Sequence, residues 1–147
     1  IEEMYPDHNF KGWGDPSGNN KNQSNSETPF QIMRAAGIPC NPTQSNDPMK
    51  RRAALEVPMK EMCMDGKPRF TVLPKAVMIR KGLQGGFCYR RVQVSGERYT
   101  DEPDKNEYSH PVEALEYALQ GEGEGRQALS RQGFNKPVTA KVKFSVF

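Results

Sequence analysis

The sequence predicts an α/β fold, because strand-like apolar stretches alternate with segments that begin like helices. Apolar stretches at 9–13 and 38–43 each precede a helix start. A β-hairpin pattern lies between the second and third helix starts and completes the alternation. The helix starts share one pattern, a capping residue with a proline in the turn that follows, and the capping residues are Thr28, Asp47 and Ser109.

The first strand-like stretch, 9–13, leads into the segment Gly14-Asp15-Pro16-Ser17-Gly18. This Pro-Gly turn is expected to expose the carboxylate of Asp15. A polar loop without periodicity follows as far as Thr28, which caps a helix with Pro29 at its first position. The apolar side of this helix is expected to consist of Ile32, Met33 and Ala36, and the helix is expected to end at Gly37.

The second helix is expected to begin after Asp47, with Pro48 at its first position. Pro58 lies inside this helix and lacks the backbone donor for the preceding turn, so we expect a kink or a break there. The inward stripe of the helix is expected to contain Leu55, Met59, Met62 and Cys63.

The third helix follows a short helix at 76–81 and a β-hairpin whose strands are separated by Ser95-Gly96. It begins at Ser109, and its opening turns place His110 and Glu113 three residues apart on one face. Glu116 lies three residues further on and could face the same cleft or solvent. An acid at a strand end, Asp15, and an acid on a helix, Glu113, could share a divalent metal ion once folding brings them together.

Composition sets the outer bounds of function. The 147 residues suffice for one domain and, with 35% hydrophobic residues and a mean hydropathy of -0.84, the chain is polar for a globular protein. No run is long enough for a transmembrane helix. The three cysteines are odd in number and widely spaced, which argues against a disulfide framework or a zinc site. No phosphate-binding loop of the Walker type occurs, and no Ser or Cys nucleophile stands out beside a histidine.

The basic residues form local groups, although the net charge is only +3. Such side chains could follow a phosphate backbone, or they could be part of an ordinary solvated surface of mixed charge. One group is Lys50, Arg51 and Arg52, and a second runs along the hairpin region with Lys75, Arg80, Lys81, Arg90 and Arg91.

Several landmarks, in their order and spacing, resemble the nuclease domain of the large terminase subunit of tailed bacteriophages. The resemblance covers about residues 9 to 121. The landmarks are the Gly-Asp-Pro-Ser-Gly turn, Thr28-Pro29-Phe30, Ala36-Gly37-Ile38-Pro39, Asn46-Asp47 leading into Arg51, the 82–89 segment and Lys105-Asn106-Glu107-Tyr108-Ser109-His110.

This resemblance implies an RNase H-like fold with three acidic ligands for two Mg²⁺ or Mn²⁺ ions. Asp15 matches the second acid, and Glu113 stands where the family more often has an aspartate after Ser-His. In the family the first acid lies on the opening strand of the sheet, before the segment that corresponds to Asp15. We therefore expect that this chain lacks the first strands and is the C-terminal part of a longer protein. His110 could orient Glu113, contact a phosphate, or have a structural role only.

The resemblance also implies that the protein is an endonuclease that cuts concatemeric viral DNA into genome lengths in the cytoplasm of the host cell. Residues 1–120 would belong to the nuclease domain, 121–125 would be a Gly/Glu hinge and 126–147 a basic tail. The implied partners are double-stranded DNA, the motor domain of the same subunit, the portal and the small terminase subunit. The alternative is a non-catalytic terminase remnant, or a DNA- or portal-binding module, that lacks the first metal ligand.

Overall fold

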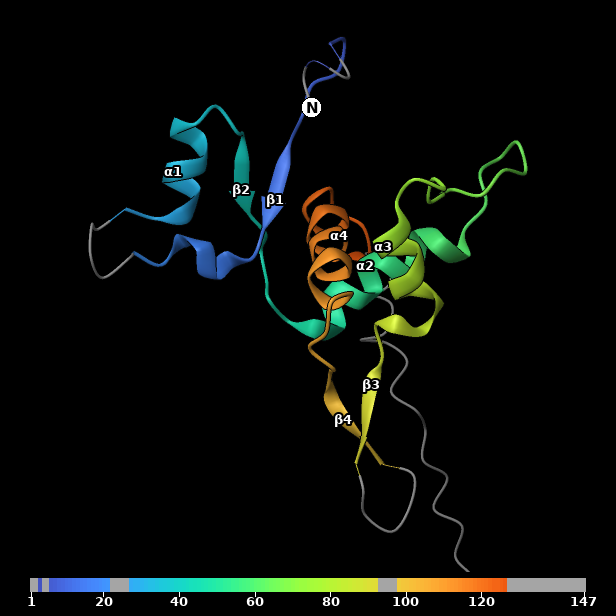
Figure 1. Cartoon of the computed structure of the whole chain (residues 1–147). Coiled ribbons are helices and arrows are strands. Elements are labelled where there is room, and N and C mark those ends of the chain that lie inside the picture. Colours follow the sequence, from blue (N-terminus) through green and yellow to red (C-terminus); the bar gives the residue numbers. More distant parts are fainter. Residues whose placement is uncertain (1–2, 4–5, 22–26, 93–97, 127–147) are drawn as a thin grey trace, which may run out of the picture.

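Two small sheets lie on opposite sides of a central group of helices in the computed structural model, which describes residues 3, 6–21, 27–92 and 98–126 (Figure 1). In the first sheet, β1 (Gly12–Gly14) pairs in parallel with β2 (Cys40–Pro42), and α1 (Pro29–Ala35) lies between them in the sequence and packs against β2. In the second, β3 (Tyr89–Val92) pairs antiparallel with β4 (Arg98–Pro103). The mixture of helices and small sheets agrees with the predicted α/β class, while the RNase H-like arrangement stays a prediction.

The central helices are α2 (Pro48–Lys60) and α4 (Ser109–Gly121), which pack against each other. The short α3 (Val77–Lys81) continues into a wide helical turn, Gly82–Gly86, which also packs on α4. The largest apolar residues of the core are contributed by α1, α2, α4 and β2. They are Phe30, Cys40, Leu55, Val112 and Tyr117.

Two of the three predicted helix caps are confirmed. Thr28 and Gln31 form a reciprocal capping box at the start of α1, and Asp47 Oδ1 accepts a hydrogen bond from the Met49 N–H at 2.9 Å. The prediction for Ser109 is wrong. Ser109 is the first residue of α4, and its hydroxyl donates to the Asn106 carbonyl at 2.7 Å, so it stabilises the preceding turn instead of capping the helix.

The predicted inward stripe of α2 is partly wrong. Leu55 is buried, but Met59 and Met62 are 49% and 63% exposed, and Cys63 is exposed as well. Of the two outcomes expected at Pro58, a kink or a break, the break does not occur, because the helix continues to Lys60. The buried side of α2 is set by its contact with α4, and at helical spacing it consists of Arg51, Ala54, Leu55 and Pro58.

The C-terminal part of the described chain turns back onto the core through close glycine contacts. Gly121 ends α4 so near Trp13 that a Cβ atom there would lie 2.2 Å from the indole ring. Gly125, at a φ of 76°, lies against the backbone of Ala54. The expected hinge at 121–125 therefore begins inside α4. Residues 127–147 of the expected basic tail, and the Ser95-Gly96 turn, lie outside the described residues. Within the described part of the chain, no helix is long and apolar enough to cross a membrane.

Candidate functional site

A small hollow lies where α2 and α4 meet the turn after β1. Its volume is about 250 Å³, and we refer to it as the hollow. The two acids singled out in the sequence, Asp15 and Glu113, both line it although they are almost one hundred residues apart. The complete lining is Asp15, Asn46, Pro48, Arg51, Lys105, Glu113 and Tyr117.

Asp15 is held by its own turn. Its Oδ1 accepts a hydrogen bond from the Ser17 N–H at 2.8 Å, which caps the 3-10 helix Pro16–Asn19. Partial burial raises the pKa of this carboxyl, but the hydrogen bonds from Ser17, the nearby Tyr117 hydroxyl and the charge of Arg51 outweigh burial and hold the pKa below its usual value. Asp15 is therefore an ionised carboxylate at neutral pH.

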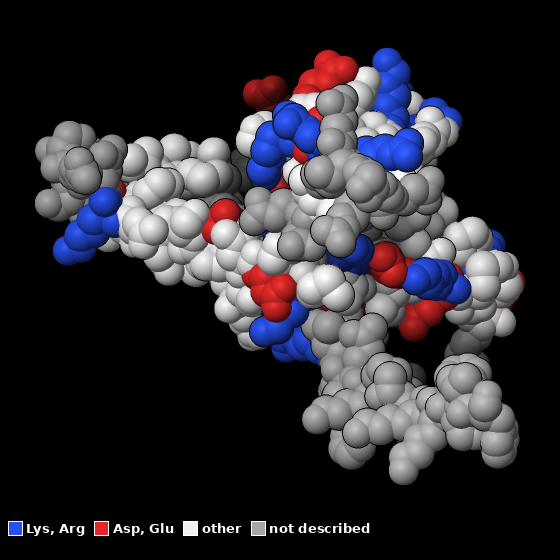
Figure 2. Space-filling model, turned by 90° about the horizontal axis from the view of Figure 1, so that it is seen from below, with Lys and Arg blue, Asp and Glu red and all other residues white. Residues whose placement is uncertain are grey.

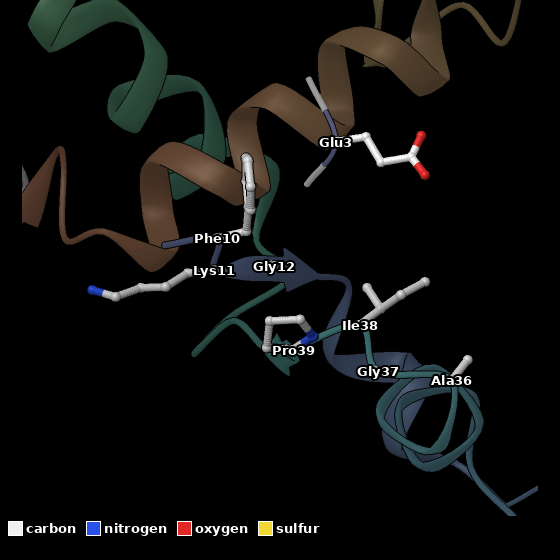
Figure 3. A pocket seen from close by; sticks show the side chains of 8 residues that line it. All are labelled: Glu3, Phe10, Lys11, Gly12, Ala36, Gly37, Ile38 and Pro39. Atoms are coloured by element: carbon white, nitrogen blue, oxygen red, sulfur yellow. The ribbon is translucent and has the colours of Figure 1, made fainter. Parts of the chain in front are cut away.

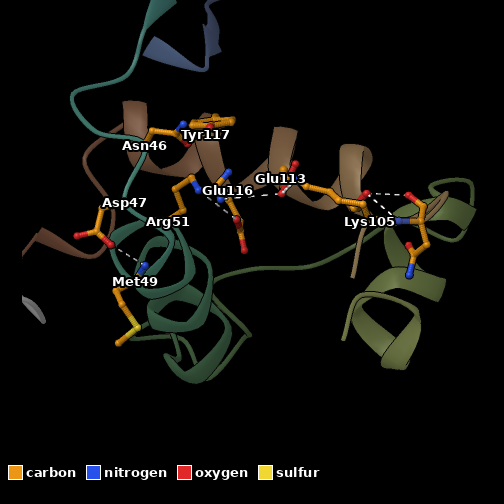
Figure 4. A network of polar contacts seen from close by, with 10 residues as sticks. Asn46, Asp47, Met49, Arg51, Lys105, Glu113, Glu116 and Tyr117 are labelled. Carbon is orange, nitrogen blue, oxygen red and sulfur yellow. Dashed lines mark hydrogen bonds and ion pairs between the residues drawn. The ribbon is translucent and has the colours of Figure 1, made fainter. Parts of the chain in front are cut away.

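Glu113 is buried on the inward face of α4 and faces two cations (Figure 4). The Lys105 ammonium lies 2.5 Å from Glu113 Oε1, and the Arg51 Nη2 lies 3.9 Å from the same oxygen. Lys105 lies in the loop before α4 and its side chain is 63% exposed, whereas the Arg51 side chain is only 8% exposed. The negative charge of Glu113 is thus balanced by two cations, the exposed side chain of Lys105 and the buried side chain of Arg51.

The side chain of Arg51 extends from α2 toward α4, and its guanidinium carbon lies 4.9 Å from the centre of the Tyr117 ring (Figure 4). Its Nε lies 3.9 Å from Glu116 Oε2 and has no hydrogen-bond acceptor among the described residues. The Tyr117 hydroxyl donates to the Asn46 amide oxygen, so the ring is held by this hydrogen bond and by its contact with Arg51. Burial, followed by the nearby carboxylate of Asp15, raises the pKa of Tyr117 to about 12.

Glu116 is buried beside Arg51 and does not face solvent. Burial raises the pKa of its carboxyl to about 7, because the opposing charge of Arg51 compensates only in part and the nearby Glu113 adds to the rise. The carboxyl of Glu116 therefore titrates closer to neutral pH than an ordinary glutamate does.

The other predicted site residues lie apart from the hollow. His110 is exposed and does not line it, although it shares α4 with Glu113. Lys50 is exposed at the start of α2, and Arg52 lies over the Tyr89 ring at 4.6 Å. Lys81, Arg90 and Arg91 are exposed on α3 and β3, where Arg90 pairs with Asp104 at 2.6 Å. On the face shown in Figure 2, basic and acidic side chains are interspersed.

The sequence analysis did not predict three polar residues of the lining, which are Asn46, Lys105 and Tyr117. Tyr117 follows Glu113 by four residues, so helical spacing was a signal that the two share a face. The burial of Arg51 also had a signal, because Arg51, Ala54, Leu55 and Pro58 recur at helical spacing.

A larger cavity, of about 540 Å³, lies beside β1 and the segment after α1 (Figure 3). Its lining is mainly apolar, and Lys11 and Glu3 are the charged members. This cavity gathers no set of groups suited to acid, base or metal chemistry, so we regard the hollow as the candidate site.

The metal-binding capacity of the hollow rests on two carboxylates. Among the described residues, no three His, Cys, Asp or Glu side chains come close enough together to hold a metal ion. Comparisons of the chain with protein-family models, curated proteins and solved structures give no match. The functional argument therefore depends on the geometry and charge of the hollow.

Proposed function

We propose that this chain is a metal-dependent DNA endonuclease of the phage large-terminase type, with the hollow as its active site. The observation that carries the proposal is that two carboxylates, of Asp15 and Glu113, and two basic side chains, of Arg51 and Lys105, line one small volume. Carboxylate oxygens suit Mg²⁺ or Mn²⁺, and guanidinium and ammonium groups suit phosphate oxygens. In metal-dependent hydrolysis of a phosphodiester bond, the cation activates water and basic groups help to hold the phosphate.

Asp15 and Glu113 are the residues that would hold a divalent ion, which when bound activates water and stabilises charge on the leaving oxygen. The chain prepares Asp15 for this role, since the Ser17 N–H orients the carboxylate and its lowered pKa keeps it ionised. Glu113 is fixed by its place on a packed helix. The terminase resemblance requires a third acid, which the lining of the hollow does not include.

The charge balance at Glu113 favours a second candidate, a non-catalytic terminase remnant or a DNA- or portal-binding module. Lys105 and Arg51 already neutralise Glu113, so a cation must compete with Lys105 for the carboxylate. In either case the proposed partners are double-stranded DNA, the motor domain, the portal and the small terminase subunit, in the host cytoplasm.

Two matched variants test the metal site. Asp15→Asn removes the charge but keeps a capping side chain, because Asn and Asp cap equally well. Asp47→Asn is the control, since Asp47 is also a cap followed by proline but does not line the hollow. We expect Mn²⁺ binding, measured by isothermal titration calorimetry, to be lost in Asp15→Asn and kept in Asp47→Asn.

Plasmid cleavage in Mn²⁺ separates the two candidate functions. Cleavage by the unaltered chain that Asp15→Asn abolishes supports the endonuclease. Mn²⁺ binding without cleavage supports the non-catalytic module. Equal Mn²⁺ binding by both variants would overturn the assignment of the hollow as a metal site.

A further inference from the structure

Arg51 is an unusual member of the hollow because a charged side chain is buried there without strong hydrogen bonds to its acidic neighbours. The residue is 7% exposed, and its contacts with Glu113 and Glu116 are both 3.9 Å, which is longer than a hydrogen bond (Figure 4). Its Nε has no acceptor among the described residues. Buried polar groups are generally hydrogen-bonded. Arg51 also lines the hollow, so an acceptor that enters this volume can reach the guanidinium.

The surroundings of Arg51 fix its position and leave space beside it. The Tyr117 ring covers one face of the guanidinium, and Glu116 lies near Nε. The hollow of about 250 Å³ has room for several molecules of the size of water, each of which fills about 30 Å³ of the liquid. Lys105 supplies a second cation at the rim.

We propose that Arg51 is the phosphate-binding residue of the hollow and donates hydrogen bonds to the oxygens of a phosphate ester. A planar guanidinium matches phosphate geometry, and its placement beside the Asp15 and Glu113 carboxylates sets an anion site next to the cation site. The inference rests on the proposed function in taking DNA as the source of the phosphate. The anion site itself exists without metal or cleavage.

Arg34 offers an internal comparison. Its Nε donates to the Cys40 carbonyl at 3.0 Å and its Nη2 to the Asn41 amide oxygen at 2.9 Å. The guanidinium of Arg34 therefore has acceptors within the protein, whereas that of Arg51 is set beside an open volume. Added phosphate should distinguish the two.

The test is a titration of the full chain with inorganic phosphate in EDTA, followed by the ¹H–¹⁵N signals of the arginine Nε–H groups. The Asp15→Asn variant is used first, because it removes a carboxylate that repels phosphate and keeps the cap. We expect a saturable shift of the Arg51 signal, identified by its loss in Arg51→Lys, and no saturable shift of the Arg34 signal. In the unaltered chain, the same shift should need about fivefold more phosphate, which corresponds to about 1 kcal/mol of repulsion.

An absent shift at Arg51 in both proteins, or an equal drift of the Arg51 and Arg34 signals, would overturn the proposal. Because EDTA removes divalent ions, this outcome is independent of metal binding and cleavage. A chain that binds phosphate at Arg51 but fails the Mn²⁺ test would retain the anion site and lose the proposed endonuclease.

Discussion

Replacing Glu116 with glutamine tests whether a buried carboxylate destabilises the packing of α2 against α4. Glutamine has the shape of a protonated glutamate but cannot ionise. Glu116 is 4% exposed and its pKa is raised to about 7, mainly by burial. Because that value exceeds the ordinary 4.5, the folded protein holds more protons than the unfolded protein between these pH values. Stability should therefore fall as the pH rises through this window.

The size of the effect follows from the pKa. A tenfold change in a proton-binding constant is worth about 1.4 kcal/mol, so a rise from 4.5 to about 7 lowers the free energy of unfolding by about 3 kcal/mol once the pH exceeds both values. We expect Glu116→Gln to be more stable than the unaltered chain by about 3 kcal/mol at pH 8, and by less than about 1 kcal/mol at pH 5.

Urea unfolding of both proteins at pH 5, 6, 7 and 8 measures this difference. Glu56→Gln is the control, since Glu56 forms an exposed pair with Lys60 at 2.7 Å and should change stability by less than about 0.5 kcal/mol. The reasoning is refuted if Glu116→Gln is the less stable protein at pH 8, because the pairing of Glu116 with Arg51 would then outweigh the burial of its charge. A difference that does not change with pH would also refute it.

Three further outcomes test other contacts. Lys105→Met removes the ammonium group beside Glu113, which competes with a metal ion for the carboxylate by about 1 kcal/mol. Mn²⁺ affinity measured by calorimetry should therefore rise about fivefold. Unchanged affinity would place Lys105 away from Glu113 in solution. Gly121→Ala would put a Cβ atom 2.2 Å from the ring of Trp13. This substitution should lower the free energy of unfolding in urea by about 1–3 kcal/mol and alter the fluorescence of the single tryptophan. Full stability would argue against the close packing of α4 on β1. Thr28→Ala removes the cap of α1 and should cost about 1 kcal/mol in the same assay, whereas no loss would mean that α1 contributes little to stability.

The parts of the fold that depend on local chemistry were predictable from the sequence. A threonine or an aspartate before a proline satisfies the backbone donors at a helix start within a few residues, which is why the caps at Thr28 and Asp47 were identified. Ser109 has the same pattern, but its hydroxyl is used by Asn106, a competing local contact that the pattern does not reveal. The pairing of Asp15 and Glu113 in one hollow was also expected, whereas their use as metal ligands stays a prediction.

The sequence by itself determined the mixed α/β class, most helix starts and the two acids worth testing, because turn and cap chemistry act over a few residues. Only the tertiary structure decided what surrounds those acids. Arg51 belongs to a run of basic residues, which is typical of an exposed surface. It is buried instead, because α4 packs on that side of α2. The same docking places Glu116 next to it and raises its pKa, since desolvation and charge pairing depend on neighbours that are distant in the chain.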